Sequence, residues 1–548
     1  MGKRRIRLTA LALALALCAG LTAGCGQQSG GMELSVCVGD SYATLDPIYA
    51  EDISSQTVLV HLYENLMRVT AGGSGEATVV NGMAQSVETE QNEDGTVTYT
   101  FRLRNSDWSD GERVTAEDFA YAWRRLADPA SHSPYAALLS VVAGYQEARL
   151  SGDMSLLQVS AESETVFQVT LTGKYDWFLR EVCTSPATMP LREDVIQRLK
   201  EAQGEDGSWW SDPAALVTNG PYQVEEQAAG SYLQLISSGK EQTGPYRLTF
   251  HFASSAGEAQ ELYHQEVVDA VWPLTEERLM ELSQDESWQP IPQLATYCVV
   301  YNCGAESSLT DPAIREALTL AVDRNALAEL AGVTALAAEG FIPPGVPESE
   351  EADFRTTGGA LLDNDPDHVA DYQAQAAEVL GDAGYTGSGL GELEYLYVED
   401  GYTGAVAQEL CRQWSQVLHV DVTPRAVTNQ ELWAALREGN YTLAGVNLEA
   451  PGNDAECFLM DWISQSYDNV AGYENSAYDT LMSIIARASD SQARMGCLHD
   501  AEALLLEDQV LNPLYTQGTA WDLRDHLTGA CRDARGWFVF TGVTEKTA

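Results

Sequence analysis

"DWSDGERVTAEDFAYAWRRLADP", residues 107–129, is the stretch that decides how this chain folds. Thr115 is a natural N-cap, and Asp118 stands three residues later, as in a variant of the capping box. Apolar residues then recur at helical spacing from Phe119 to Leu126, so one face of the helix is expected to be buried. The helix must end before the closing proline, because the preceding residue avoids helical geometry. The stretch therefore predicts a capped helix on a sheet and carries no chemistry of its own.

Helix and strand patterns alternate along the rest of the chain. After residue 300 we expect helices over 311–330, 368–385 and 403–418, and strands over 392–399 and 419–427. This β-α-β order predicts an α/β domain with a mixed or parallel sheet. Further strands are expected at 32–38, 96–104, 165–172, 246–253 and 296–303, with a hairpin over 220–238. A chain of 548 residues is too long for one hydrophobic core, so two or three domains are expected.

Composition describes a globular and strongly acidic protein. Hydrophobic residues make up 45% and charged residues 20%, while the formal net charge is -50. Binding to phosphate backbones needs clustered lysine and arginine, so we expect no nucleic-acid partner. The same charge argues against broad docking on an anionic membrane surface.

The N-terminus has the pattern of an export signal. Basic residues, a short apolar run and small residues lead to Cys25, so residues 1–24 are predicted to be a signal peptide. "LTAGC" resembles the lipobox of bacterial lipoproteins, with Thr22 where leucine is usual, and it implies lipidation of Cys25. A plain secretory signal with a chance cysteine is the alternative. Residues 25–32 then form a flexible tether, and the protein is placed on the extracytoplasmic face of the cell membrane.

Motifs for catalysis and for metal binding are absent. The sequence contains no GxSxG, HExxH or P-loop motif. The eight cysteines after Cys25 are too sparse for a disulfide framework, and buried free thiols are the favoured interpretation. "DNDPDH" at 363–368 departs from a calcium-binding loop and is interpreted as a turn rich in aspartate and asparagine. We therefore expect no enzyme activity, no metal and no cofactor.

The opening stretch, continued to "ASHSPYA", closely resembles the family 5 extracellular solute-binding proteins, in particular the oligopeptide-binding proteins of ABC importers. Other matching segments follow in the family's order, and together they cover nearly everything from residue 33 onward. They are "TLDPIYA" (44–50), "LYENLMRV" (62–69), "DPAALVTNGPYQV" (212–224), "YCVVYNCGAESSLTDPAIREALTLAVDRNAL" (297–327), "AAEVLGDAGY" (376–385), "AGYENSAYDTLM" (471–482) and "LNPLYT" (511–516).

This resemblance implies an α/β, two-lobe periplasmic-binding-protein fold of type II, in the large cluster with an extra small domain and a hinge between the lobes. Lobe 1 is expected to combine residues 33–70, 181–298 and 511–548. Residues 71–180 form the extra small domain of lobe 1, and residues 299–510 form lobe 2. The lobes close on the ligand by hinge bending, and an extended peptide bonds between them like an added strand.

Ligand-binding residues are carried over position by position from the family pattern. Tyr135 in "SPYA" matches a tyrosine that contacts the bound peptide, and Tyr515 in "PLYT" lies on the segment returning through the cleft. Trp272 stands where the family enters the interlobe surface. Each of the three could equally be a core residue.

The segment 446–459, "VNLEAPGNDAECFL", departs from the family pattern. Peptide-binding relatives usually carry an aspartate here that anchors the α-amino group of the ligand, whereas this chain has Pro451. Glu449 and Asp454 are the two candidates to replace it. A ligand with a blocked N-terminus, a shifted register or a ligand that is not a standard peptide are the alternatives.

The sequence therefore predicts a monomeric, lipid-anchored binding protein that captures oligopeptides and delivers them to the permease subunits of an ABC importer. A peptide-sensing surface receptor is one alternative. Another is a family 5 binder of a non-peptide ligand, such as a nickel chelate, haem or a sugar, because a fold alone does not fix the ligand. An exported hydrolase is disfavoured by the missing nucleophile and metal motifs.

Overall fold

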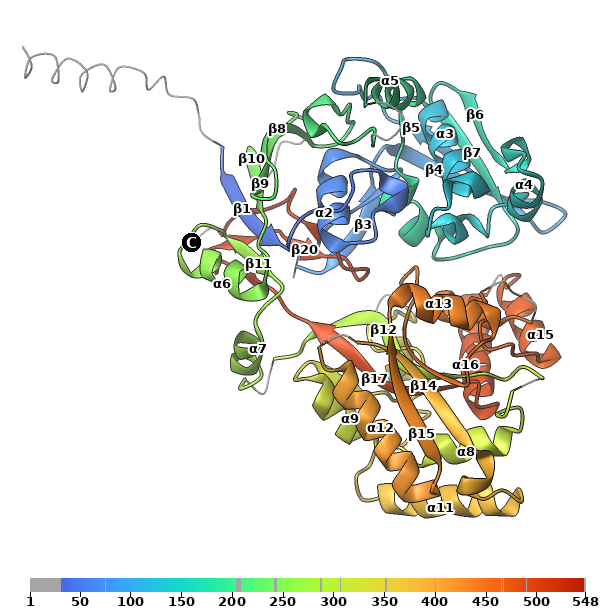
Figure 1. Ribbon diagram of the computed structural model, residues 1–548. Coiled ribbons are helices and arrows are strands. Elements are labelled where there is room, and N and C mark those ends of the chain that lie inside the picture. The colour runs from blue at the N-terminus through green and yellow to red at the C-terminus, as the bar shows by residue number, and fades with distance from the viewer. Residues whose placement is uncertain are drawn as a thin grey trace, which may run out of the picture.

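The computed structural model describes residues 31–546 except 74, 204–207, 241–243, 286–287, 306, 350–351, 400, 465, 467 and 489. The chain forms two lobes, each built around its own six-stranded sheet (Figure 1). The predicted leader, the tether up to residue 30 and Cys25 lie outside the described residues. Among the residues described, no helix combines the length and the apolar character needed to cross a membrane.

The first lobe contains the N-terminal strand and most of the first half of the chain. Its sheet has the order β18-β11-β1-β10-β9-β8, in which β1 runs parallel to both β10 and β11. The strands are β1 (Glu33–Val38), β8 (Tyr222–Ala228), β9 (Tyr232–Ser237), β10 (Arg247–His251), β11 (Ala270–Trp272) and β18 (Asp522–Leu523). The hairpin predicted over 220–238 is confirmed as β8 and β9, which pair antiparallel.

Within the first lobe, a four-stranded antiparallel sheet forms a separate layer, in the order β4-β5-β7-β6. Its strands are β4 (Ala84–Gln91), β5 (Val97–Leu103), β6 (Val159–Ser163) and β7 (Val166–Leu171). Helix α3 (Ala116–Ala127) packs on β6 and β7, as the opening stretch predicts. The carboxylate of Asp118 accepts a hydrogen bond from the Thr115 N–H at 2.7 Å and another from the Trp108 indole at 3.2 Å. These bonds fix the turn to the start of the helix.

The sheet of the second lobe has the order β13-β17-β12-β16-β14-β15. Its strands are β12 (Ile291–Tyr301), β13 (Ala335–Ala337), β14 (Glu392–Val398), β15 (Asp421–Val427), β16 (Leu443–Glu449) and β17 (Leu511–Thr519). Helix α12 (Thr403–Leu418) connects the parallel pair β14 and β15, so the predicted β-α-β unit is confirmed.

The prediction of one continuous helix over 311–330 is wrong. The periodic segment 311–330 forms two helices, α8 (Pro312–Leu320) and α9 (Arg324–Ala331). The chain breaks at Asp323, whose side chain accepts a hydrogen bond from the Ala326 N–H and caps the second helix. Apolar spacing continues through the break because both helices contribute side chains to the same hydrophobic core.

The remaining elements cover the sheets or connect them. The first lobe also holds α2 (Ile53–Leu62), α4 (Tyr145–Ser151), α5 (Glu193–Gln203), α6 (Ala256–His264), α7 (Glu276–Leu282), and the short strands β2 (Met67–Ala71), β3 (Ala77–Asn81), β19 (Leu527–Thr528), β20 (Cys531–Arg532), β21 (Phe538–Val539) and β22 (Thr544–Glu545). The second lobe also holds α10 (Phe354–Gly358), α11 (Val369–Asp382), α13 (Asn429–Glu438), α14 (Ala455–Leu459), α15 (Ser476–Ile485) and α16 (Ser491–Glu507).

Two chain segments connect the lobes. The chain leaves the first sheet after β11 and enters the second at β12, and it returns from β17 directly to β18 (Figure 1). Residues 291–298 and 511–519, assigned to the first lobe by sequence, are strands of the second sheet in the structure. The sequence-based limits at 298 and 511 therefore fall inside or at the end of paired strands, and the exact division between the lobes stays a prediction.

Candidate functional site

A cavity of about 770 Å³ lies between the two lobes. We call it the interlobe cavity. The first lobe contributes the segments 39–40, 50–56, 134–138 and 185–187, together with Trp272 and the segment 532–537. The second lobe contributes 293–295, Trp433, Asn447 and 449–451. Because both lobes form its walls, any motion of one lobe against the other changes its volume.

Strand β16 gives the second-lobe wall an open backbone edge. On one side β16 pairs with β12 along its whole length, from Leu443 to Glu449. On the other side its pairing with β14 involves only Leu443 and Ala444. Among the described residues, the rest of that edge has no strand neighbour, while the side chains of Asn447 and Glu449 are exposed and line the cavity. An unpaired edge of this kind can accept another extended chain by backbone hydrogen bonding.

Tyr135, one of the ligand-binding residues predicted from the sequence, lies on the first-lobe wall of the interlobe cavity. Its hydroxyl donates to the carbonyl of Ala50 at 2.9 Å and accepts from Gln56 Nε2 at 3.0 Å. Burial raises the pKa of Tyr135 well above the usual value, so the phenol is neutral at physiological pH. The side chain is half-buried and its ring is held in place by the two hydrogen bonds.

Trp272, at the end of β11, also lines the interlobe cavity. Its indole Nε1 donates a 2.9 Å hydrogen bond to Oγ1 of Thr519, the last residue of β17. Its ring packs against Phe538 with a centroid separation of 6.0 Å. One face of the cavity is thus bonded directly to a strand that crosses between the lobes.

Glu449 extends from β16 into the interlobe cavity and faces the first lobe. Its carboxylate has no hydrogen-bond or ion-pair partner among the residues that the structure describes. Although the side chain is accessible from the cavity, the surrounding protein raises its pKa by desolvation, and attraction to Arg532 partly offsets this effect. Its charge in turn raises the pKa of Tyr135 on the opposite wall. Three of the five sequence-selected ligand residues, Tyr135, Trp272 and Glu449, therefore meet at one cavity.

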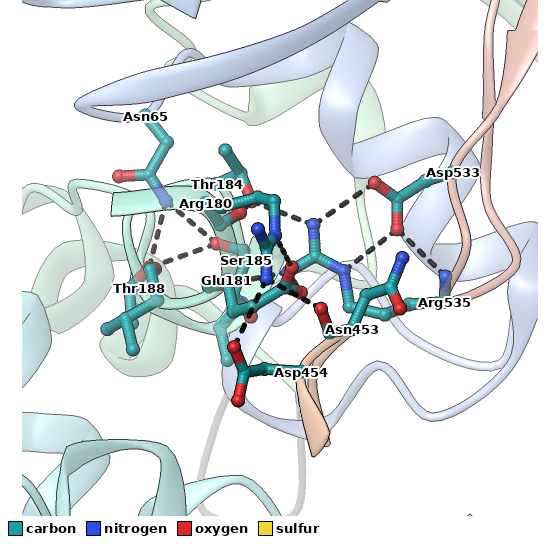
Figure 2. A network of polar contacts seen from close by, with 12 residues as sticks. Asn65, Arg180, Glu181, Thr184, Ser185, Thr188, Asn453, Asp454, Asp533 and Arg535 are labelled. Atoms are coloured by element: carbon teal, nitrogen blue, oxygen red, sulfur yellow. Dashed lines mark hydrogen bonds and ion pairs between the residues drawn. The ribbon is translucent and has the colours of Figure 1, made fainter. Parts of the chain in front are cut away.

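Asp454 does not join them, and the structure gives it a different role. It is 2% exposed and caps the start of α14. Its carboxylate pairs with Arg494 at 2.6 Å and lies 3.6 Å from Arg180 of the first lobe. Arg180 also donates to the carbonyl of Asn453 at 2.6 Å, so this cluster connects the lobes at one side of the cavity (Figure 2). Of the two candidates for the ligand amine, Asp454 is therefore held by arginine side chains, whereas Glu449 lines the cavity.

Tyr515 is likewise removed from the cavity. It is 1% exposed on β17, and its ring stacks on Tyr297 with the centroids 5.0 Å apart. Both rings belong to the hydrophobic core of the second lobe. The sequence placed Tyr515 correctly on the returning segment, but its side chain points to the core side of the sheet.

Several residues that line the cavity were not predicted from the sequence. Trp433 on α13 and Trp537 are aromatic lining residues, and Arg532 and Arg535 contribute positive charge. The sequence could have indicated Trp433, because it lies next to the buried residues of α13, Leu432 and Leu436, and is not one of them. Nothing in the sequence indicated the two arginines, because both lie after 511–516, the last segment that resembles the family.

The two arginines are held differently. Arg535 donates to Asp533 at 2.8 Å, to the carbonyl of Glu181 at 2.8 Å and to Thr184 at 2.7 Å (Figure 2). Desolvation lowers the pKa of Arg532 to about 10, and the charges of Asp533 and Glu449 act against this shift. Both arginines are therefore cations at neutral pH.

Comparisons with known proteins agree with this architecture. The family model described as "Bacterial extracellular solute-binding proteins, family 5 Middle" matches residues 78–470. The probable deoxycholate-binding periplasmic protein YgiS of Escherichia coli is 27% identical over 502 residues, which are 89% of this chain and 88% of that protein. The periplasmic oligopeptide-binding protein OppA of Salmonella typhimurium is 26% identical over 506 residues, 87% of this chain and 86% of its own.

A solved structure shares the fold over nearly the whole chain. The structure of OppA from Burkholderia pseudomallei superposes with a TM-score of 0.71 at 25% identity, and the match covers 91% of this chain and 95% of that one. The two-lobe α/β fold expected from the sequence is thereby confirmed.

Proposed function

Since the chain belongs to the family 5 bacterial extracellular solute-binding proteins, we propose that it captures oligopeptides in the interlobe cavity and delivers them to the permease of an ABC importer. The observation that carries this proposal is a cavity between two lobes with an open strand edge along one wall. The volume of about 770 Å³ falls within the ~300–1,000 Å³ typical of ligand pockets.

The open edge of β16 suits a peptide better than a compact ligand. A peptide laid along this edge obtains backbone hydrogen bonds that do not depend on its side chains. Side chains would then alternate toward the two walls, as in any extended strand. This arrangement tolerates many sequences, which is what a nutrient importer requires.

Three residues receive roles on this proposal. Tyr135 and Trp272 supply aromatic surface on the first-lobe wall, and Glu449 holds the ligand's α-amino group by a charge-assisted hydrogen bond. Glu449 takes this role because its carboxylate is free and faces the cavity, whereas Asp454 is bound to Arg494.

Membrane attachment and transport complete the proposal. Lipidation of Cys25 would anchor a monomer at the membrane surface, where the closed form docks on the permease subunits. A peptide-sensing receptor would use the same cavity and anchor without a permease. Peptide uptake in cells that lack this protein separates the two functions, because only the importer role requires uptake to fall.

A non-peptide ligand is the second candidate, and one relative favours it. YgiS is named as a probable deoxycholate-binding protein, and it matches this chain over most of both sequences. A steroid acid would use the aromatic walls of the cavity rather than the edge of β16.

Native mass spectrometry of the purified, undenatured protein tests the proposal. We expect bound masses that fragment into peptide ladders. A single sharp mass with no peptide fragments would overturn the peptide ligand and favour the second candidate. If the protein is purified empty, titration with a peptide pool under the same conditions decides, and a pool without any binding member contradicts the proposal.

A further inference from the structure

The hairpin formed by β20 and β21 presents two arginines to the interlobe cavity, and only one of them is fully paired. Arg535 has its guanidinium surrounded by Asp533, Glu181 and Thr184. Arg532, by contrast, has no hydrogen-bond partner for Nε or Nη1 among the described residues. The difference is not one of exposure, since Arg532 is only 9% exposed.

A buried guanidinium with two unpartnered nitrogens is costly to fold. Removing a cation from water is unfavourable unless hydrogen bonds and an opposite charge replace the lost hydration. The ring of Phe538, 5.8 Å from the guanidinium carbon, offers only a weak cation–π contact. Lysine and arginine side chains normally avoid such positions, so this placement calls for a partner that the described residues do not supply.

The acidic groups near Arg532 leave it available. Asp533 is its neighbour in sequence, but the Asp533 carboxylate is bound by Arg535. Glu449 attracts Arg532 from the second-lobe wall, yet no described acidic side chain forms an ion pair with Arg532. The interlobe cavity therefore carries an unpaired positive charge on one wall and an unpaired negative charge on the other.

We infer that Arg532 is the receptor for a carboxylate of the ligand, so that the cavity selects peptides that bring a carboxylate to the first-lobe wall and an amine to Glu449. This inference rests on the proposed function and narrows its substrate class. A guanidinium attracts a carboxylate and binds it through charge-assisted hydrogen bonds. The carboxylate comes either from an acidic side chain or from the C-terminus of the peptide.

Calorimetric titration with a matched set of short alanine-based peptides distinguishes the two sources. One pair differs by a single Glu or Gln, and a second pair by a free or an amidated C-terminus. We expect at least one pair to differ about 10-fold or more in Kd, since a charge-assisted contact is stronger than a neutral one. The pair that differs identifies the source of the carboxylate.

Three variants connect this preference to Arg532. R532M keeps the side-chain length without the charge, and we expect it to remove the preference while neutral peptides still bind. R532K keeps the charge without the planar fork and should retain part of the preference. R437M is the matched control, because Arg437 is an exposed cation over Trp433 at the second-lobe wall, and it should leave the preference intact.

Ligand-free stability provides a readout that does not depend on peptides. If Arg532 is an unpaired buried charge, R532M should raise the Tm of the ligand-free protein, because an apolar side chain suits that position better. A lower Tm would mean that Arg532 is a structural cation and would overturn the inference.

The possible failures can be told apart. Wild-type protein that binds all members of the set equally overturns the carboxylate receptor and leaves the peptide function standing. A preference of equal size in R532M and wild type does the same, since another group must then cause it. Wild-type protein that binds no peptide at all overturns the proposed function itself.

Discussion

The indole nitrogen of Trp272 donates a 2.9 Å hydrogen bond to the hydroxyl of Thr519. Trp272 lines the interlobe cavity, and Thr519 is the last residue of the strand that leads back to the first lobe. A ligand that presses on the indole therefore acts directly on a segment that must bend when the lobes move. The hydrogen bond therefore joins the cavity wall to one of the two segments that connect the lobes.

We predict that W272F and T519V each weaken peptide binding by about 5-fold, which corresponds to one hydrogen bond of about 1 kcal/mol. W272F removes the donor but keeps an aromatic ring, while T519V removes the acceptor outside the cavity lining. Calorimetric titration with one tight peptide measures both. If W272F weakens binding and T519V does not, the ring contact matters and the bond to the crossing strand does not.

For Tyr135 we predict that the hydroxyl and the ring have separable effects. Y135F loses the bonds to Ala50 and Gln56, so the free energy of unfolding should fall by about 1 kcal/mol with little change in ligand affinity. Y135A also removes the ring and should weaken binding more than 10-fold if the ring contacts the ligand. Equal affinities of Y135A and Y135F would remove Tyr135 from the binding surface.

Glu449 should discriminate between free and blocked amines. We predict that E449Q weakens binding of peptides with a free N-terminus about 10-fold and leaves their acetylated forms nearly unchanged. Desolvation raises the pKa of Glu449, so the wild-type preference for free amines should disappear as the pH falls through a value above the usual glutamate pKa. Affinity for acetylated peptides that stays flat over the same pH range is the control. Equal losses for both peptide forms would exclude Glu449 as the amine anchor.

Asp454 should affect stability rather than ligand choice. D454N leaves Arg494 with Glu456 as its remaining acidic partner at 2.8 Å. Breaking one arm of a buried ion pair should lower the free energy of unfolding by about 3 kcal/mol. Denaturant unfolding measures this loss, and the free-amine preference should stay as in the wild type. A D454N protein of normal stability that loses this preference would reverse the assignments of Asp454 and Glu449.

Sequence patterns predicted the elements of the fold well because their causes are local. The capping residues and the apolar stripe of 107–129 are sufficient to specify α3. Where two helices continue one stripe, as over 311–330, periodicity cannot reveal the break, because both helices bury apolar side chains in the same core. The break depends on the cap at Asp323, which resembles any other aspartate in a chain with 81 acidic residues.

The site was only partly predictable, for a different reason. Tyr135, Trp272 and Glu449 reach the interlobe cavity, whereas Asp454, only five positions beyond Glu449, turns into a buried ion pair. Which carboxylate is free depends on Arg494, an arginine distant in sequence. Arg532 could not be predicted for the same reason. Its sequence neighbour Asp533 suggests an ion pair with Arg532, but in the structure Asp533 pairs with Arg535.

Asp461 predicts how the stability of the protein depends on pH. Desolvation, aided by the charge of Asp468, raises its pKa from 3.8 to about 7. The folded protein therefore holds this proton up to about pH 7, whereas the unfolded chain releases it near its ordinary pKa. Between these values the folded state binds more protons, so this contribution to stability is present at acidic pH and is lost as the pH rises toward 7.

The variant D461N cannot ionise and should not show this loss. We expect it to match the wild type near about pH 4 and to exceed it by about 1 kcal/mol or more near about pH 8. Urea unfolding at both pH values measures the difference. Since other groups also titrate in this range, only the change in the gap between D461N and wild type reports on Asp461. A gap that is the same at both pH values would show that Asp461 ionises as an ordinary aspartate in the folded protein.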